Sequence, residues 1–93
     1  MVIGVLEARL SLPEARSLKD KRRVLRSLKD RARNQINVSV AETDLQDLWQ
    51  SAKLAFVTVA AEGDVVEKRL AEIRELLQST PRFVLLDVRT ERI

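Results

Sequence analysis

The sequence predicts an α+β fold in which a four-stranded antiparallel sheet carries two helices on one face. Two amphipathic helical segments and four segments of strand-like alternation follow one another in the order β-α-β-β-α-β. Right-handed crossovers in both β-α-β units place the helices on the same side of the sheet, which is the ferredoxin-like sandwich. A chain of 93 residues has room for one such domain, spanning residues 1–93.

The first β-α-β unit begins with residues 2–12, which alternate as a strand. Ser17 is the predicted N-cap of a helix that extends to about residue 35, with Asp20 in the position of a capping box. The apolar face of this helix consists of Leu18, Leu25, Leu28 and Ala32. Residues 36–41 alternate as the second strand.

The second unit follows a polar segment, residues 42–50, in which we expect a short helical turn around 45–49. Residues 53–61 are the third predicted strand. Asp64 is expected to cap the second helix, with Glu67 as its capping-box partner. The apolar stripe of that helix consists of Val66, Leu70, Ile73 and Leu77, and residues 83–89 form the last predicted strand.

The composition argues against catalysis. Apolar residues make up 45% and charged residues 33% of the chain, which is typical of a folded protein. Cys and His are absent, and this excludes disulfides, thiolate metal sites, Cys nucleophiles and His-dependent catalysis. We therefore expect a protein that is not an enzyme and that holds no cofactor and no metal. A thermophilic origin would also account for a charged, Cys-free composition.

The apolar segments are too short for a membrane protein, because a spanning helix needs about 20 apolar residues. The N-terminal stretch has no basic leading region and carries Glu7 and Arg9 within its apolar run, unlike a signal peptide. We expect a cytoplasmic protein with no membrane partner.

The first helix carries a large excess of positive charge. Residues 17–35 contain eight basic and two acidic side chains, whereas the second helix mixes both signs. At spacings of three or four residues the first helix has six like-charge neighbours and three opposite-charge neighbours. At about 0.2–0.5 kcal/mol per pair, this balance is unfavourable by roughly 1 kcal/mol.

Six of these basic side chains share an arc of about 120° on the helix. We call them the basic stripe: Lys19, Arg22, Arg23, Arg26, Lys29 and Arg33. The stripe is either a solvated helix face or a surface for an anionic partner. Because helix stability does not account for it, we interpret the stripe as a nucleic-acid-binding surface that contacts phosphates.

Lys21 falls in the middle of the apolar face of the same helix. We expect its aliphatic stem to lie on the core and its ammonium group to extend to solvent. The alternative is a buried ion pair with Glu42 or Asp44.

The segment 42–50 gathers three carboxylates and the single Trp. Glu42, Asp44 and Asp47 are expected to belong to a polar loop, although close carboxylates can also bind Mg²⁺ or Ca²⁺ or act as an acid/base pair. Trp49 is expected to pack over the edge of the core, and the alternative is an exposed contact for a partner.

The sheet face away from the helices is predicted to be largely apolar. The residues assigned to it are Ile3, Val5, Leu54, Phe56, Phe83 and Leu85. An apolar face of this size needs covering, and a two-fold homodimer is the commonest way to cover it.

Three segments carry a resemblance to a known family: SLKDKR (17–22), NVSVAE (37–42) and QDLWQSA (46–52). Together they resemble the YlxP-like family of small bacterial proteins, a domain of unknown function, over essentially the whole chain. The motif residues are Ser17, Leu18, Lys19, Lys21, Arg22, Glu42, Gln46, Asp47 and Trp49. The resemblance implies a ferredoxin-like fold and no established catalytic residue. Members are often encoded near transcription-termination, translation-initiation and ribosome-maturation factors, which implies an association with RNA or ribosomes.

Two functional hypotheses follow from the sequence. The first is a non-enzymatic protein associated with RNA or the ribosome, with the basic stripe as its phosphate-binding surface. The second is a protein-interaction or small-ligand regulatory module that dimerises through its sheet.

Overall fold

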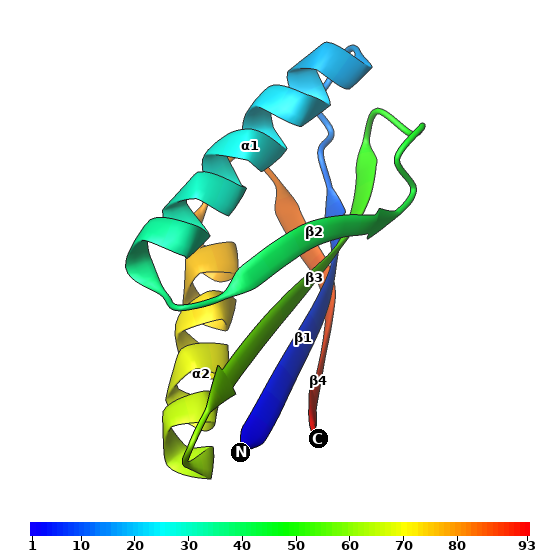
Figure 1. Cartoon of the computed structure of the whole chain (residues 1–93). Coiled ribbons are helices and arrows are strands. Elements are labelled where there is room, and N and C mark those ends of the chain that lie inside the picture. Colours follow the sequence, from blue (N-terminus) through cyan, green and yellow to red (C-terminus); the bar gives the residue numbers. More distant parts are fainter.

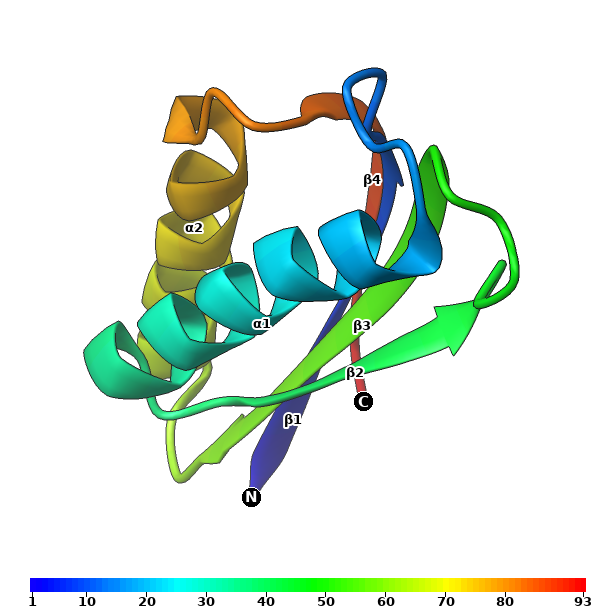
Figure 2. The same cartoon turned by 90° about the horizontal axis from the view of Figure 1, so that it is seen from above.

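The computed structural model describes all 93 residues and contains the six elements in the predicted order (Figure 1). The strands and helices are β1 (Val2–Ser11), α1 (Leu18–Gln35), β2 (Ser39–Asp44), β3 (Ser51–Ala60), α2 (Gly63–Ser79) and β4 (Val84–Arg92). The sheet order is β2-β3-β1-β4, and every neighbouring pair is antiparallel. Both helices cover the same face of the sheet (Figures 1 and 2), so the predicted ferredoxin-like sandwich is confirmed.

The core lies between this sheet face and the two helices. Helix α1 contributes Leu25, Leu28 and Ala32 to the core. Helix α2 contributes its predicted apolar residues Val66, Leu70, Ile73 and Leu77, together with Leu76. Gly4 of β1 faces α2, where a Cβ atom would collide with Val66 Cγ1. Glycine therefore allows α2 to approach the sheet closely.

The two helices begin differently. Ser17 caps α1 as predicted: its side chain accepts a hydrogen bond from Asp20 N at 3.1 Å, and Asp20 Oδ2 accepts one from Arg16 N at 3.0 Å. The predicted cap of α2 is wrong. That helix begins two residues earlier than predicted, at Gly63, and its N-cap residue Glu62 makes no side-chain capping bond.

The strand boundaries also differ from those predicted. β2 begins three residues later than predicted because Ile36 still belongs to the end of α1, where its N–H donates to Ala32 O at 2.9 Å. A short helical turn was expected around residues 45–49. The structure has no helix there but one hydrogen-bonded turn, in which Leu48 N donates to Leu45 O at 3.1 Å. Neither α1 nor α2 has the length and apolar character of a membrane-crossing helix.

The open sheet face, the one away from the helices, is built from other residues than predicted. Leu54, Phe56 and Phe83 are core residues, exposed by 0%, 0% and 5%, so their assignment to this face is wrong. The reason is the register of β3 on β1, which pairs Leu6 with Phe56 on the helix side. Leu85 is also misassigned: it pairs with Leu10 and packs against the core.

The residues that do occupy the open face follow from the same register. Val57 and Val59 of β3 lie opposite Val5 and Ile3 of β1, and these four form an apolar end. The other end of the face is charged: Arg9 pairs with Lys53 on one side and with Asp87 of β4 on the other. The open face therefore combines an apolar half with a charged half.

Candidate functional site

One end of the sandwich is organised around the ammonium group of Lys21, which lies in the first turn of α1 and is 1% exposed. Its Nζ donates hydrogen bonds to Leu45 O at 2.7 Å and to Leu48 O at 2.8 Å, and lies 2.7 Å from Glu42 Oε2. Two N–H donors of the ammonium therefore have carbonyl acceptors, and the Glu42 carboxylate balances its charge. These contacts hold the β2–β3 loop, residues 45–50, beside the start of α1 (Figures 1 and 2).

The ion pair explains why a lysine can occupy the middle of an apolar helix face. Glu42 faces the helices because its register partner on β3 is the core residue Leu54. The expectation that the Lys21 ammonium reaches solvent is wrong, because loop carbonyls take the place of water. Glu42 Oε2 is itself buried and has no other polar partner. Loss of one member would leave the other charge buried and unpaired.

Leu45 has a backbone conformation that leucine rarely adopts, with φ at 62°. This left-handed conformation costs a non-glycine residue about 1–2 kcal/mol. Three hydrogen bonds support it: Leu45 N donates to Asp44 Oδ1 at 2.8 Å, and Leu45 O accepts from Lys21 and from Leu48 N. The first part of the loop is thus fixed by contacts to its neighbours.

The end of the loop is fixed to the segment that precedes α1. Gln50 Nε2 donates to Pro13 O at 3.1 Å and to Ala15 O at 3.2 Å. The carbonyl oxygen of Gln50 accepts from Leu12 N at 2.9 Å. The loop is therefore anchored on both sides of residue 49.

Between these anchors the loop exposes two large apolar side chains. Leu48 is 51% and Trp49 52% exposed. Trp49 was expected to pack over the edge of the core, and about half of its surface remains open to a partner. Exposed apolar side chains that are held together on a surface are typical of contact sites.

The basic stripe lies on the exposed surface of α1, and most of it is unpaired. Five of its residues are exposed or partly exposed and make no ion pair; we call these the unpaired stripe: Lys19, Arg22, Arg23, Arg26 and Lys29. Arg33 differs, because its guanidinium lies 3.8 Å from Asp30 Oδ1 and donates to Val40 O at 3.2 Å. The unpaired stripe begins in the helical turn where Lys21 holds the loop.

The three carboxylates of segment 42–50 do not converge. Glu42 faces the helices, Asp44 lies opposite Lys53 in the sheet, and Asp47 is exposed in the loop. No three Asp or Glu side chains gather as ligands that could hold a metal ion. The oxygen-ligand alternative for this segment has no geometric support.

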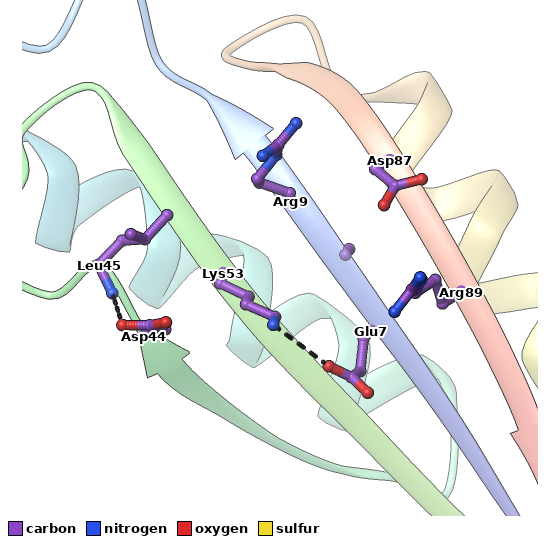
Figure 3. A pocket seen from close by; sticks show the side chains of 8 residues that line it. Glu7, Arg9, Asp44, Leu45, Lys53, Asp87 and Arg89 are labelled. Carbon is purple, nitrogen blue, oxygen red and sulfur yellow. Dashed lines mark hydrogen bonds and ion pairs between the residues drawn. The ribbon is translucent and has the colours of Figure 1, made fainter.

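A shallow hollow of about 280 Å³ lies at the charged end of the open sheet face (Figure 3). Three acidic and three basic side chains line it: Glu7, Asp44, Asp87, Arg9, Lys53 and Arg89. Lys53 Nζ lies 3.6 Å from Glu7 Oε2. Because the lining charges balance, the hollow has little net attraction for an anion or a cation.

The family-motif residues gather at the end of the molecule where Lys21 holds the β2–β3 loop. Ser17 and Lys21 begin α1, Glu42 pairs with Lys21, and Gln46, Asp47 and Trp49 lie on the loop.

Sequence reasoning missed Leu45 and Gln50, because Leu45 acts through its backbone and Gln50 binds carbonyls distant in sequence. A usable signal was Lys21 itself, since a buried ammonium needs three acceptors and one carboxylate cannot supply them all.

Comparisons with known proteins agree with the fold and the family. The chain matches the family described as "Protein of unknown function (DUF503)" over residues 3–90. It is 33% identical over 90 residues to the uncharacterized protein YlxP of Bacillus subtilis (strain 168), covering 97% of this chain and 98% of that protein.

Two designed proteins have similar structures. One is the de novo designed protein LFR1 1 with ferredoxin fold, with a TM-score of 0.55 and 18% identity over 98% of this chain and 88% of that chain. The other is the de novo designed protein Foldit4, with a TM-score of 0.53 and 15% identity over 98% and 97% of the two chains. At such identities these likenesses show the fold alone. The family match and the similarity to YlxP show more: this chain belongs to the DUF503 family of proteins of unknown function.

Proposed function

We propose that this protein is a non-enzymatic RNA-binding protein, associated with RNA or with the ribosome, that contacts phosphates through α1. The observation that carries the proposal is the unpaired stripe, five cationic side chains on one helix face with no acidic partner. The absence of His and Cys from the chain supports a binding role over a catalytic one.

The energetics of α1 favour an anionic partner. Like-charge neighbours outnumber opposite ones along the stripe, and each such pair costs about 0.2–0.5 kcal/mol. Lys19 and Arg22 also lie near the positive end of the helix dipole, where a cation is disfavoured by about 0.3–1 kcal/mol. Phosphates bound along the helix would offset these repulsions.

The shape of the stripe favours a polymer over a small anion. From Lys19 to Lys29 it extends about 15 Å along the helix axis, on a convex surface. An extended phosphate backbone can follow such a surface, whereas a small anion needs convergent donors. Contacts of this kind supply affinity without reading sequence. The gene neighbours implied by the family resemblance favour RNA among polyanions.

The direct test is the salt dependence of RNA binding. Binding of a fluorescently labelled, unstructured RNA of about twelve nucleotides is followed by anisotropy at several KCl concentrations. If all five stripe residues neutralise phosphates of a single strand, log Kobs against log[salt] should fall with a slope of about −3.5.

A pair of matched double variants separates α1 from general electrostatics. Arg22→Glu with Arg26→Glu should reduce the slope to about −2 and weaken binding at least about tenfold. The control on α2 is Lys68→Glu with Arg74→Glu, which should leave the affinity within about twofold. Arg69 is unsuitable as a control because it donates to Thr58 Oγ1 and Val59 O. Binding without salt dependence, or equal losses from both variants, contradicts the proposal.

A second candidate function is self-association through the open sheet face. Val57 and Val59 are 40% and 52% exposed at the apolar end of this face, beside Ile3 and Val5. This arrangement supports a homodimer within a protein-interaction or ligand-regulated module. The helices cover the opposite face, so such a dimer would leave the unpaired stripe accessible (Figure 2).

Sedimentation tests the dimer. The chain should sediment at about twice its 10.6 kDa mass at tens of micromolar, and Val57→Lys should give the monomer with an unchanged circular dichroism spectrum. A monomeric parent chain at that concentration excludes this function. Thr43→Lys, at an exposed position of the edge strand β2 outside the apolar end, serves as the control.

A further inference from the structure

We infer that Trp49 is the base-stacking platform of a single-stranded RNA site, and that the unpaired stripe of α1 holds the phosphates of the same strand. This inference rests on the proposed function and adds the kind of RNA that binds: a strand with an unstacked base.

The first argument is that the loop is held firmly while its aromatic side chain is left in solvent. Lys21 binds two loop carbonyls, and Gln50 binds two carbonyls before α1. Trp49 lies between these anchors and is still 52% exposed. A platform on a fixed loop loses little conformational entropy when a ligand stacks on it.

The second argument is that the loop is bound to the helix that carries the cations. The ammonium of Lys21 binds the loop from the same helical turn that carries Lys19, with Arg22 and Arg23 directly following. The loop with the exposed ring is thus bound to the helix that carries the unpaired cations. An exposed aromatic ring combined with unpaired Lys and Arg side chains is what single-strand-binding proteins use, with bases on the ring and phosphates on the cations. A duplex keeps its bases stacked and cannot use the ring in this way.

The third argument is the charge next to the ring. Asp47, together with Leu48, Gln50 and Ser51, lines the shallow surface hollow beside Trp49. A carboxylate repels phosphate, but it can accept hydrogen bonds from the amino groups of a base. The loop is therefore matched to an RNA base, and α1 to the RNA phosphate backbone.

The fluorescence of the protein reports on this site alone, because the chain has one Trp and no Tyr. An unlabelled, unstructured RNA of about twelve nucleotides should quench the emission of Trp49 as it binds. The same RNA annealed to its complement should cause little quenching and should bind at least about tenfold more weakly in matched salt.

Substitutions on the loop test the aromatic ring itself, with the affinity measured by anisotropy of labelled RNA. Trp49→Ala should weaken single-strand binding about tenfold to a hundredfold, whereas Trp49→Phe should retain most of the affinity of the parent protein. Leu48→Ala is the matched control, since Leu48 is equally exposed on the same loop, and it should change the affinity less than about threefold.

The outcomes distinguish this inference from the proposed function. If Trp49→Ala binds the single strand as tightly as the parent while the α1 double variant loses salt-dependent binding, the base platform is wrong and the phosphate surface stands. If single strand and duplex bind equally and Trp49 emission does not change, the inference is also overturned. If no RNA binds with salt dependence, both proposals fail.

Discussion

The helices α1 and α2 have 18 and 17 residues and lie on the same face of one sheet, yet their charged side chains are placed and paired differently. Every residue that α2 buries is apolar, and two of its charged side chains contact the sheet: Glu67 lies near Arg92, and Arg69 donates to Thr58 Oγ1. Its remaining charged side chains carry both signs. Helix α1 buries a lysine and leaves five cations unpaired.

The comparison separates a helix arranged for stability from one that carries another requirement. Nothing in the packing of α2 calls for a ligand. In α1 the buried ammonium fixes a loop that exposes Trp49, and the surface cations repel one another. The repulsion among the surface cations and the exposure of the Trp49 ring do not stabilise the isolated fold, and both become useful if a polyanion binds there.

The largest expected effect comes from breaking the buried pair of α1. Lys21→Met keeps an unbranched side chain but leaves Glu42 and two loop carbonyls unpaired. We expect the free energy of unfolding to fall by about 3–5 kcal/mol, measured by urea denaturation. Lys68→Met on the exposed face of α2 is the control and should change it by less than about 0.5 kcal/mol. A loss below about 1 kcal/mol for Lys21→Met would show that the pair is not structurally important.

The next effect concerns the packing of α2. Gly4→Val inserts a branched side chain where Val66 and Leu70 already approach the strand. Overpacking at such a position should cost about 1–3 kcal/mol in thermal or urea unfolding. Val2→Ile, at a partly buried position on the same strand, should be nearly neutral. If the Gly4→Val variant were as stable as the parent protein, α2 would be able to move away from the sheet at no cost.

A smaller effect should distinguish the two helix starts. Ser17→Ala removes the side-chain cap of α1 and should cost about 1 kcal/mol. Asp64→Ala in the first turn of α2 removes no N-cap, only an exposed hydrogen bond from Val65 N and a charge at the helix dipole, and should cost at most about 0.5 kcal/mol. If urea denaturation gives equal losses, the assigned difference between the two caps is incorrect.

The order of elements could be predicted because each element has a clear period and a start or stop signal. The face of β3 could not be predicted from alternation, since Leu54 and Phe56 on one side are matched by Val57 and Val59 on the other. The register with β1 decides between them, and that is a long-range property. Lys53 lies on the same face of β3 as the two valines, and its charge indicates that this face points to solvent.

The site was predictable only in part for a related reason. The sequence named Glu42 as a possible partner of Lys21 but placed it after the second strand. The observed β2 extends to Asp44, so Glu42 lies on a strand and faces the helices. The backbone carbonyls that complete the ammonium site have no side-chain signature.

The central claim is that α1 carries its surface charge for a ligand and at some expense to its own stability. Its most direct test is to measure unfolding free energy and RNA affinity on one variant, Arg22→Glu with Arg26→Glu. Because these changes convert several repulsions into attractions, stability should stay the same or rise by up to about 1 kcal/mol, while RNA affinity falls at least about tenfold. Reduced stability together with unchanged RNA affinity would contradict the account.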